Sequence, residues 1–250
     1  DSIGLSVFGT SAKYISFLEQ NNIIPDKYSF QKLRLILSTG SPLIEENYDF
    51  VYNKWKHDVQ LSSISGGTDI ISCFALGNPI KPVIKGKLQS LGLGMNVKSF
   101  DKNGKSLISD KGELVCVAPF PSMPIYFFND NNNLKYKSAY FDAYPNIWKH
   151  GDYISIYEDG TVKIFGRSDT TLNPGGVRIG TAEIYRVLDK IKYIEDSVVI
   201  GYQYNEDEVI VLFVKMQKKQ LTNKIKEDIK NHIKINCSPR HIPYRIIQIQ

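Results

Sequence analysis

Two apolar segments that each run into a polar, glycine-containing loop constrain the fold of this chain most strongly. The first covers residues 33–37 and continues into Ser-Thr-Gly-Ser-Pro at 38–42. The second covers residues 59–64 and continues into Ser-Gly-Gly-Thr-Asp at 65–69. Short buried strands that feed such turns are typical of an α/β protein. Because ligands gather at the carboxyl ends of such strands, the two loops mark the expected binding site.

The rest of the chain predicts further β structure and then a second, smaller unit. Two alternating segments at 153–157 and 161–165 flank Glu-Asp-Gly, which is the pattern of a β-hairpin. After residue 169 a helical face, two strands and a second helical stripe follow in order. We expect a large α/β domain with a β-rich subregion over residues 1–168 and a small α+β domain over residues 169–250. A single continuous domain is the alternative.

Composition argues against several classes of protein. The chain has 250 residues, of which 42% are hydrophobic and 23% charged, as in an ordinary globular protein with a real core. A net charge of +5 from dispersed lysines is too small for a dedicated nucleic-acid-binding protein. No apolar stretch approaches the length of a transmembrane helix. The three cysteines are widely spaced, without a Cys-x-x-Cys pair, which favours a reducing compartment, so we expect a cytoplasmic location.

Four motifs point to a chemistry only when they are taken together and in order. Alone, each has an ordinary structural explanation as a turn, a cap or a surface charge. They are Ser-Thr-Gly-Ser-Pro at 38–42, Gly-Gly-Thr-Asp at 66–69, His-Gly-Asp at 150–152, and Gly-Arg-Ser-Asp-x-x-Leu-Asn-x-x-Gly-x-Arg-Ile-Gly-x-Ala-Glu-Ile at 166–184. This series spans essentially the whole chain and resembles the adenylate-forming superfamily, which includes acyl-CoA synthetases, luciferases and peptide-synthetase adenylation domains.

Three stretches narrow the resemblance to acyl-CoA synthetases that act on acetoacetate, namely residues 7–13, 36–43 and 65–74. The resemblance implies that acetoacetate is first joined to AMP and that the thiol of CoA then displaces the AMP. Acetoacetate, ATP with Mg²⁺, and CoA are the implied small-molecule partners. Two alternatives stay open: a CoA ligase for another short or branched acid, and a homologue that kept the fold and lost catalysis.

The resemblance also implies roles for residues of the expected large domain. Gly40, Ser41 and Pro42 line the adenine pocket, where glycine lets the backbone approach the base closely. Thr68 contacts the α-phosphate. Asp152 accepts hydrogen bonds from both ribose hydroxyls, a task that suits the two oxygens of a carboxylate.

A metal ligand and an acyl pocket are implied in the second loop. Asp69 is expected to help hold Mg²⁺, a hard cation that prefers oxygen ligands. Most relatives carry Glu at this position, so the side chain here is shorter. Gly66 and Gly67 are assigned to the acyl pocket. Acetate-specific relatives have Trp where this chain has Gly66, so we expect a pocket that admits an acid longer than acetate.

The long motif implies four further roles. Arg167 binds the ribose or a phosphate, and Arg178 pairs with phosphate as a fixed cationic fork. Thr68, Asp69 and Arg178 are the implied catalytic residues. Gly176 lines the tunnel for the pantetheine arm of CoA. Asp169 is the hinge about which the small domain swings between the two half-reactions, which supports the expected domain boundary.

Two parts that the resemblance implies are missing from these 250 residues. We find no Gly/Ser/Thr-rich loop of the kind that handles the phosphates of ATP. The adenylation lysine on a Gly-Lys turn is also missing, although Ser-Pro-Arg-His-Ile-Pro at 238–243 resembles the segment upstream of it. The chain begins with Asp1 rather than Met, and a predicted strand at 246–250 runs to its last residue. We therefore expect a chain cut short at both ends, inactive alone, whose parent supplies both parts.

Overall fold

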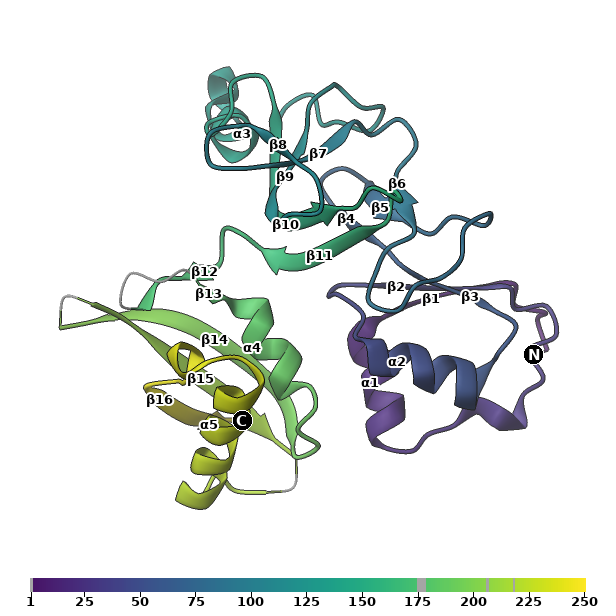
Figure 1. Cartoon of the computed structure of the whole chain (residues 1–250), viewed down its shortest axis with the longest axis vertical. Coiled ribbons are helices and arrows are strands. Elements are labelled where there is room, and N and C mark those ends of the chain that lie inside the picture. Colours follow the sequence, from purple (N-terminus) through teal and green to yellow (C-terminus); the bar gives the residue numbers. More distant parts are fainter. Residues whose placement is uncertain (1, 175–178, 206, 218) are drawn as a thin grey trace. The chain divides into compact units, whose positions relative to one another are not determined.

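The computed structural model describes residues 2–174, 179–205, 207–217 and 219–250. Its internal contacts divide the chain into two compact units, Asp1–Ile164 and Phe165–Gln250 (Figure 1). The domain boundary at residues 168 and 169 stays a prediction. None of the helices in the described ranges combines the length and the apolar character that crossing a membrane requires.

The first unit begins with a parallel three-stranded sheet whose strands are joined by helical segments. The strands pair in chain order, and both main helices cover the same face (Figure 1). The elements are β1 (Val7–Ser11), α1 (Ala12–Gln20), a 3₁₀ turn (Pro25–Lys27), β2 (Leu35–Thr39), α2 (Glu45–Phe50), a π-helical turn (Val51–Trp55) and β3 (Gln60–Ser63). The prediction that the segments at 33–37 and 59–64 form strands of an α/β sheet is confirmed.

The helical spacing of apolar residues explains why α1 packs on this sheet. Ala12, Ile15 and Leu18 follow one another at intervals of three, so they share one face of the helix, and all three are buried. The hydroxyl of Ser11 caps the helix by accepting a hydrogen bond of 3.1 Å from the backbone N–H of Tyr14. The sequence therefore fixes both where α1 starts and which side it presents to the core.

The β-rich subregion consists of two further sheets and one short helix. The smaller sheet has the order β4-β5-β6, and the larger has the order β11-β10-β9-β7-β8. The elements are β4 (Ser65–Gly67), β5 (Ser72–Leu76), β6 (Ser90–Leu91), β7 (Val97–Phe100), β8 (Ser106–Leu107), β9 (Gly112–Cys116), a 3₁₀ turn (Asn131–Asn133), α3 (Leu134–Tyr140), β10 (Trp148–Ile156) and β11 (Val162–Arg167).

The hairpin predicted around Glu-Asp-Gly is confirmed as β10 and β11. Tyr157 donates a backbone hydrogen bond of 2.9 Å to Thr161, which closes the turn. Gly160 has a φ of +76°, a conformation that glycine adopts without steric cost. The turn therefore uses its glycine as the sequence pattern indicates.

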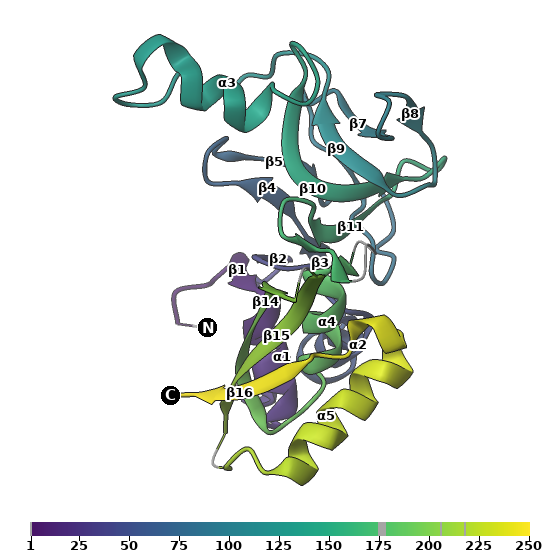
Figure 2. The same cartoon turned by 90° about the vertical axis from the view of Figure 1, so that its left-hand side faces the viewer.

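The second unit contains a mixed sheet in the order β14-β15-β16, in which β15 pairs antiparallel with β14 and parallel with β16. Two helices cover one face of this sheet (Figure 1, Figure 2). The first helical face that the sequence predicts after residue 169 corresponds to α4 and the second to α5, and both pack into one core. Ile191 belongs to the same core but lies beyond the end of α4. The elements are β12 (Thr171–Leu172), β13 (Ile179–Gly180), α4 (Thr181–Leu188), β14 (Ile194–Tyr204), β15 (Asp207–Met216), α5 (Asn223–Asn236), a 3₁₀ turn (Pro239–His241) and β16 (Arg245–Ile249).

A polar chain ties the segment before β16 to the first turn of α4. The Nε2 atom of His241 lies 3.1 Å from a carboxylate oxygen of Glu183, and its Nδ1 atom lies 2.8 Å from the hydroxyl of Ser238. With Nε2 protonated, the ring donates to the carboxylate and accepts from the hydroxyl. The segment at 238–243 is therefore anchored to a helix that lies more than fifty residues earlier in the chain.

Gly166 allows the end of β11 to approach the first turn of α4 closely. Its φ is +101°, and a Cβ atom placed on it would lie 2.4 Å from the Cβ of Ala182. Real Cβ atoms do not come that close, so any other residue would push these two segments of the second unit apart. The glycine of the Gly-Arg-Ser-Asp motif therefore has a packing role of its own.

We predict that Gly166→Ala lowers the free energy of unfolding by about 2–4 kcal/mol, because it adds an unfavourable φ and a steric clash. Gly104→Ala is the matched control. Gly104 also has a positive φ, of +79°, but the nearest atom to its added Cβ would be 3.7 Å away, on Tyr144. Urea denaturation should show the control losing only about 1 kcal/mol. Equal losses for the two variants would contradict the packing role of Gly166.

Candidate functional site

Both predicted loops leave the same edge of the parallel sheet. Ser11 pairs with Thr39, and Ser38 pairs with Ser63, so β1, β2 and β3 end side by side. The backbone N–H of Ile64, just after β3, donates a hydrogen bond of 2.8 Å to the carbonyl of Ser38. The carboxyl ends of β2 and β3 therefore deliver their polar loops to one place, as the sequence predicts.

The first loop owes its shape to one glycine. Gly40 has a φ of +87°, in the region that favours glycine, and only the Cβ of Ser11 lies within 4.0 Å of an added Cβ. The requirement for glycine is therefore conformational rather than steric. Gly40 and Ser41 are exposed and Pro42 is half-buried, so all three present surface at the sheet edge, as an adenine pocket there would require.

The second loop fixes the carboxylate of Asp69. The backbone turns after Gly67, and both Thr68 and Asp69 are exposed. One carboxylate oxygen of Asp69 accepts a hydrogen bond of 3.1 Å from the backbone N–H of Ile70. The other accepts a hydrogen bond of 2.7 Å from the hydroxyl of Tyr140, at the end of α3. Tyr140 was not singled out by any sequence motif, because the two residues are 71 positions apart.

Gly67 provides the space that the side chain of Asp69 occupies. A Cβ atom on Gly67 would lie 2.0 Å from the Oδ1 atom of Asp69 and 3.0 Å from the Cε1 atom of His150. The carboxylate and the imidazole therefore both approach the backbone at Gly67. The glycine is needed for close approach, which is the second common reason for glycine at a site.

Backbone atoms of β5 occupy the space that a side chain on Gly66 would need. A Cβ atom there would lie 2.0 Å from the carbonyl oxygen of Ser72 and 2.8 Å from the Cα of Cys73. The register between β4 and β5 shifts between Ser65 and Gly66, so this glycine accommodates a bulge in the β4–β5 pair. The structure thus gives Gly66 a backbone role, and its place in an acyl pocket stays a prediction.

The His-Gly-Asp motif lies on a bulge in β10. The register between β10 and β9 shifts between Lys149 and Tyr153, and Gly151 inside the shift has a φ of +84°. Bulges of this kind re-aim the side chains beside them. His150 and Asp152 are both buried, and the Nε2 atom of His150 lies 3.6 Å from a carboxylate oxygen of Asp152.

His150 links the Gly-Gly-Thr-Asp and His-Gly-Asp motifs of the first unit. Its ring packs edge-on against Phe74 at 4.7 Å between centroids, lies beside Gly67, and lies next to Asp152. No separate role is predicted for His150 from the sequence, although it stands inside a motif. The structure shows it as the contact through which the Gly-Gly-Thr-Asp loop and the ribose-binding candidate Asp152 become neighbours.

Arg167 and Asp169 are bonded to each other in the second unit. The Nε atom of Arg167 donates a hydrogen bond of 2.9 Å to one carboxylate oxygen of Asp169, and an Nη atom pairs with the other. Both side chains are about half exposed, so the pair contributes little to stability. The residue predicted to bind nucleotide and the residue predicted to be the hinge are therefore directly coupled. Gly176 and Arg178 lie outside the described residues, so their roles stay predictions.

The three cysteine thiols are unpaired and unsuited to nucleophilic attack. Burial raises the pKa of the thiols of Cys73, Cys116 and Cys237, and for Cys237 the carboxylate of Glu183 raises the pKa further. A raised pKa leaves less thiolate at neutral pH, and the thiolate is the reactive form. Cys116 is a buried member of the core, whereas Cys73 is only partly buried.

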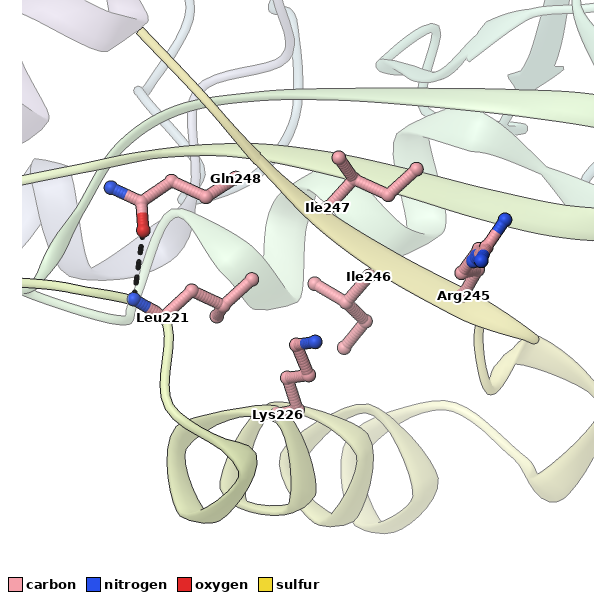
Figure 3. A pocket seen from close by; sticks show the side chains of 6 residues that line it. All are labelled: Leu221, Lys226, Arg245, Ile246, Ile247 and Gln248. Carbon is pink, nitrogen blue, oxygen red and sulfur yellow. Dashed lines mark hydrogen bonds between the residues drawn. The ribbon is translucent and has the colours of Figure 1, made fainter.

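Two hollows in the second unit are lined by residues for which no role is predicted. Figure 3 shows one of about 410 Å³ at the edge of the sheet, where Gln248 accepts a hydrogen bond of 2.8 Å from the backbone of Leu221. Its lining is Leu221, Lys226, Arg245, Ile246, Ile247 and Gln248. A larger hollow of about 640 Å³ lies on the uncovered face of the sheet, where Tyr202, Tyr204 and Tyr244 contribute aromatic surface. Among the described residues, no member of the four motifs lines either hollow.

Asp69 suits a cation that brings most of its own ligands. Over the described ranges, no three or more His, Cys, Asp or Glu side chains are arranged to hold a metal ion. Mg²⁺ does not need such a cage, because it keeps several waters and binds through one or two carboxylates together with phosphate oxygens of its nucleotide. An exposed carboxylate held at the carboxyl edge of a sheet fits that requirement.

We predict that Gly66→Ala destabilises the protein more than Gly67→Ala does. The added methyl at 66 meets backbone, which cannot move without breaking the β4–β5 pair, at a cost of more than about 2 kcal/mol. At 67 it meets the end of the Asp69 side chain, which can move only by giving up its hydrogen bonds to Ile70 and Tyr140; because Asp69 is exposed, water replaces them at a net cost of about 1 kcal/mol. Urea denaturation of both variants measures the difference, and the reverse order would show that the β4–β5 bulge is not rigid.

The chain can be compared with known proteins. No protein-family model matches it. It is 49% identical to the acetoacetyl-coenzyme A synthetase of Rhizobium meliloti (strain 1021) over 246 residues, which are 98% of this chain and 38% of that protein. It is 44% identical to the acetoacetyl-CoA synthetase of Rattus norvegicus over 100% of this chain and 38% of that protein. The solved acetoacetyl-CoA synthetase from Streptomyces lividans superposes with a TM-score of 0.88 at 38% identity, again over 99% of this chain and 38% of that one.

These similarities confirm the predicted resemblance and the predicted fold class. The chain spans 38% of the length of the relatives it matches. Both units are included in the match, because it covers nearly every residue of this chain. Along its whole length, then, this chain is similar to the C-terminal part of the acetoacetyl-CoA synthetases, and it has the fold of that part of the adenylate-forming enzymes.

Proposed function

We propose that this chain is part of an acid–thiol ligase that joins acetoacetate to CoA at the expense of ATP. The observation that carries the proposal is the 49% identity to an acetoacetyl-CoA synthetase over 98% of the chain. The chemistry of the described residues supports it. The loops after β2 and β3 leave the same edge of the sheet, where an α/β fold binds nucleotides, and the second loop carries the exposed carboxylate of Asp69 next to His150, the neighbour of the buried Asp152.

The reaction proceeds in two steps, formation of an acyl adenylate and transfer of the acyl group to CoA. A carboxylate oxygen of acetoacetate attacks the α-phosphorus of ATP, and the bond from that phosphorus to pyrophosphate breaks. The thiolate of CoA then attacks the acyl carbon of the adenylate, and AMP leaves with the oxygen that joined it. The enzyme must hold the nucleotide and offset charge that develops on the α-phosphate.

Different residues of the first unit bind the adenine, the α-phosphate and the ribose of ATP. The backbone at Gly40, Ser41 and Pro42 lies against adenine, and the hydroxyl of Thr68 donates to an α-phosphate oxygen. Asp152 accepts hydrogen bonds from the ribose hydroxyls. Burial beside His150 keeps its carboxylate in one orientation, which favours a bidentate contact.

Asp69 provides an oxygen ligand for Mg²⁺, which enters with ATP as part of the substrate. Mg²⁺ withdraws charge from the phosphates that it contacts. The protein's own part is to hold the carboxylate of Asp69 still, and its hydrogen bonds to Ile70 and Tyr140 do so.

The second unit binds CoA and provides the domain movement between the two steps of the reaction. Arg167 binds the ribose or a phosphate, Arg178 pairs with phosphate, and Gly176 leaves room for the pantetheine arm. Asp169 is the hinge, and release of its ion pair with Arg167 accompanies the swing of the small domain, residues 169–250, against the large domain, residues 1–168. A cytoplasmic location belongs to this proposal and is supported by the unpaired thiols of the three cysteines.

ATP–pyrophosphate exchange by the full-length parent tests the proposal. Acetoacetate, acetate, butyrate, 3-hydroxybutyrate and a long-chain acid are compared in parallel, and we expect exchange to be fastest with acetoacetate. Faster exchange with another acid would keep the two-step chemistry and replace the substrate. No exchange with any acid would favour a homologue that has lost catalysis. The 250-residue chain serves as the control, and we expect it to show none.

We predict that Asp152→Asn raises the KM for ATP by about 10- to 100-fold, because hydrogen bonds to a charged group are worth about 1.5–3 kcal/mol. Asp26→Asn is the matched control, since Asp26 is exposed in the turn Pro25–Lys27 of the same unit. Steady-state exchange kinetics provide the measurement, with thermal unfolding to verify that both variants are folded. An unchanged KM in folded Asp152→Asn would remove Asp152 from the nucleotide site.

A further inference from the structure

We propose that Tyr140 is a positioning residue that holds the carboxylate of Asp69 in the orientation needed by the divalent cation of the nucleotide. The inference rests on the proposed function, which places a cation at Asp69. It adds a residue that belongs to none of the four motifs and that comes from a different part of the first unit.

The contact itself leaves the carboxylate little freedom. The hydroxyl of Tyr140 donates to Oδ2 of Asp69 at 2.7 Å, and the backbone N–H of Ile70 donates to Oδ1 at 3.1 Å. Hydrogen bonds between a hydroxyl and an ionised carboxylate are short and strong. Each carboxylate oxygen has two lone pairs, so one lone pair on each remains for a cation. The carboxylate is thus held at both oxygens and is still able to bind.

Tyr140 can hold Asp69 because its own ring is fixed. The ring stacks on Trp148 with 3.6 Å between centroids and an interplanar angle of 13°. Further aromatic contacts come from Tyr136 at 5.6 Å and Phe127 at 5.7 Å. Trp148 is only 1% exposed, so the stack rests on a buried side chain. The hydroxyl is therefore presented to Asp69 from a rigid support.

Trp148, which supports the ring of Tyr140, also belongs to the strand that carries His150 and Asp152. It is the first residue of that strand, β10. Asp69 also lies over Gly67, whose missing side chain leaves space for Oδ1, and the Cε1 atom of His150 approaches that same space. A residue that aligns Asp69 with β10 therefore aligns the cation ligand with the ribose-binding carboxylate.

A purely structural role for Tyr140 is the competing explanation, in which its hydroxyl only ties α3 to the turn. Tyr136 provides the matched control for it. Tyr136 lies on the same helix and in the same aromatic cluster, and its hydroxyl donates to the backbone carbonyl of Pro124. Tyr136→Phe therefore removes an equivalent hydroxyl without a contact to Asp69.

The experiment uses the full-length protein with four variants: Tyr140→Phe, Tyr136→Phe, Asp69→Asn, and Tyr140→Phe combined with Asp69→Asn. Binding of Mn²⁺–ATP is measured by water proton relaxation, which needs no turnover. The Mg²⁺ concentration for half-maximal pyrophosphate exchange is measured alongside. We expect Tyr140→Phe to weaken Mn²⁺–ATP binding about tenfold and to raise the Mg²⁺ requirement equally, with Tyr136→Phe within about twofold of wild type. In the Asp69→Asn background, Tyr140→Phe should change nothing further.

Two results would overturn the positioning role. One is Mn²⁺–ATP binding by Tyr140→Phe that matches Tyr136→Phe. The other is a full effect of Tyr140→Phe in the Asp69→Asn background, because the hydroxyl would then act on something else. Wild-type protein that binds Mn²⁺–ATP but shows no acid-dependent exchange would refute the proposed ligase and leave the relaxation measurement to decide on Tyr140.

Discussion

The stack of aromatic rings on Trp148 is the interaction on which the first unit's candidate site depends. It seats β10 in the core of the β-rich subregion, and β10 carries the bulge that turns His150 and Asp152 inward. On its other side the stack fixes Tyr140 and, through it, Asp69. Without this buried support the polar side chains of the site would be attached to a turn and a bulge, which are the least rigid parts of a sheet.

Glycine, rather than charge, shapes the site around these side chains. Gly40 sets a backbone conformation, Gly67 makes room for a carboxylate, and Gly151 forms the bulge. Each position would tolerate few other residues, for a different physical reason at each. This explains why short motifs rich in glycine can indicate a function that depends on Asp, Thr and Arg.

Much of the fold could be predicted from the sequence, because local pattern determined it. The strand ends near residues 38 and 64, the hairpin around Gly160 and the buried faces of α4 and α5 all follow from periodicity and turn residues. Tyr140 could not be predicted, since its partner is 71 residues away and no pattern links them. The sequence motif predicts that Gly66 lines a pocket, and only the three-dimensional structure shows that a Cβ atom at this position would collide with the backbone of Ser72. The hydrogen bond from Arg167 to Asp169 could not be predicted either, because the motif identifies the two residues but not the contact between them.

The backbone contact at Gly66 has a consequence for how substitutions at this position can arise. A larger residue at this position requires the bulge between β4 and β5 to be rebuilt, so the two changes are not independent. Evolution would have to pass through the backbone change first, or accept an unstable intermediate. A directed-evolution library that varies residue 66 alone would therefore be filled mostly with unfolded protein. One that also varies residues 70–73 would open routes that single substitutions close.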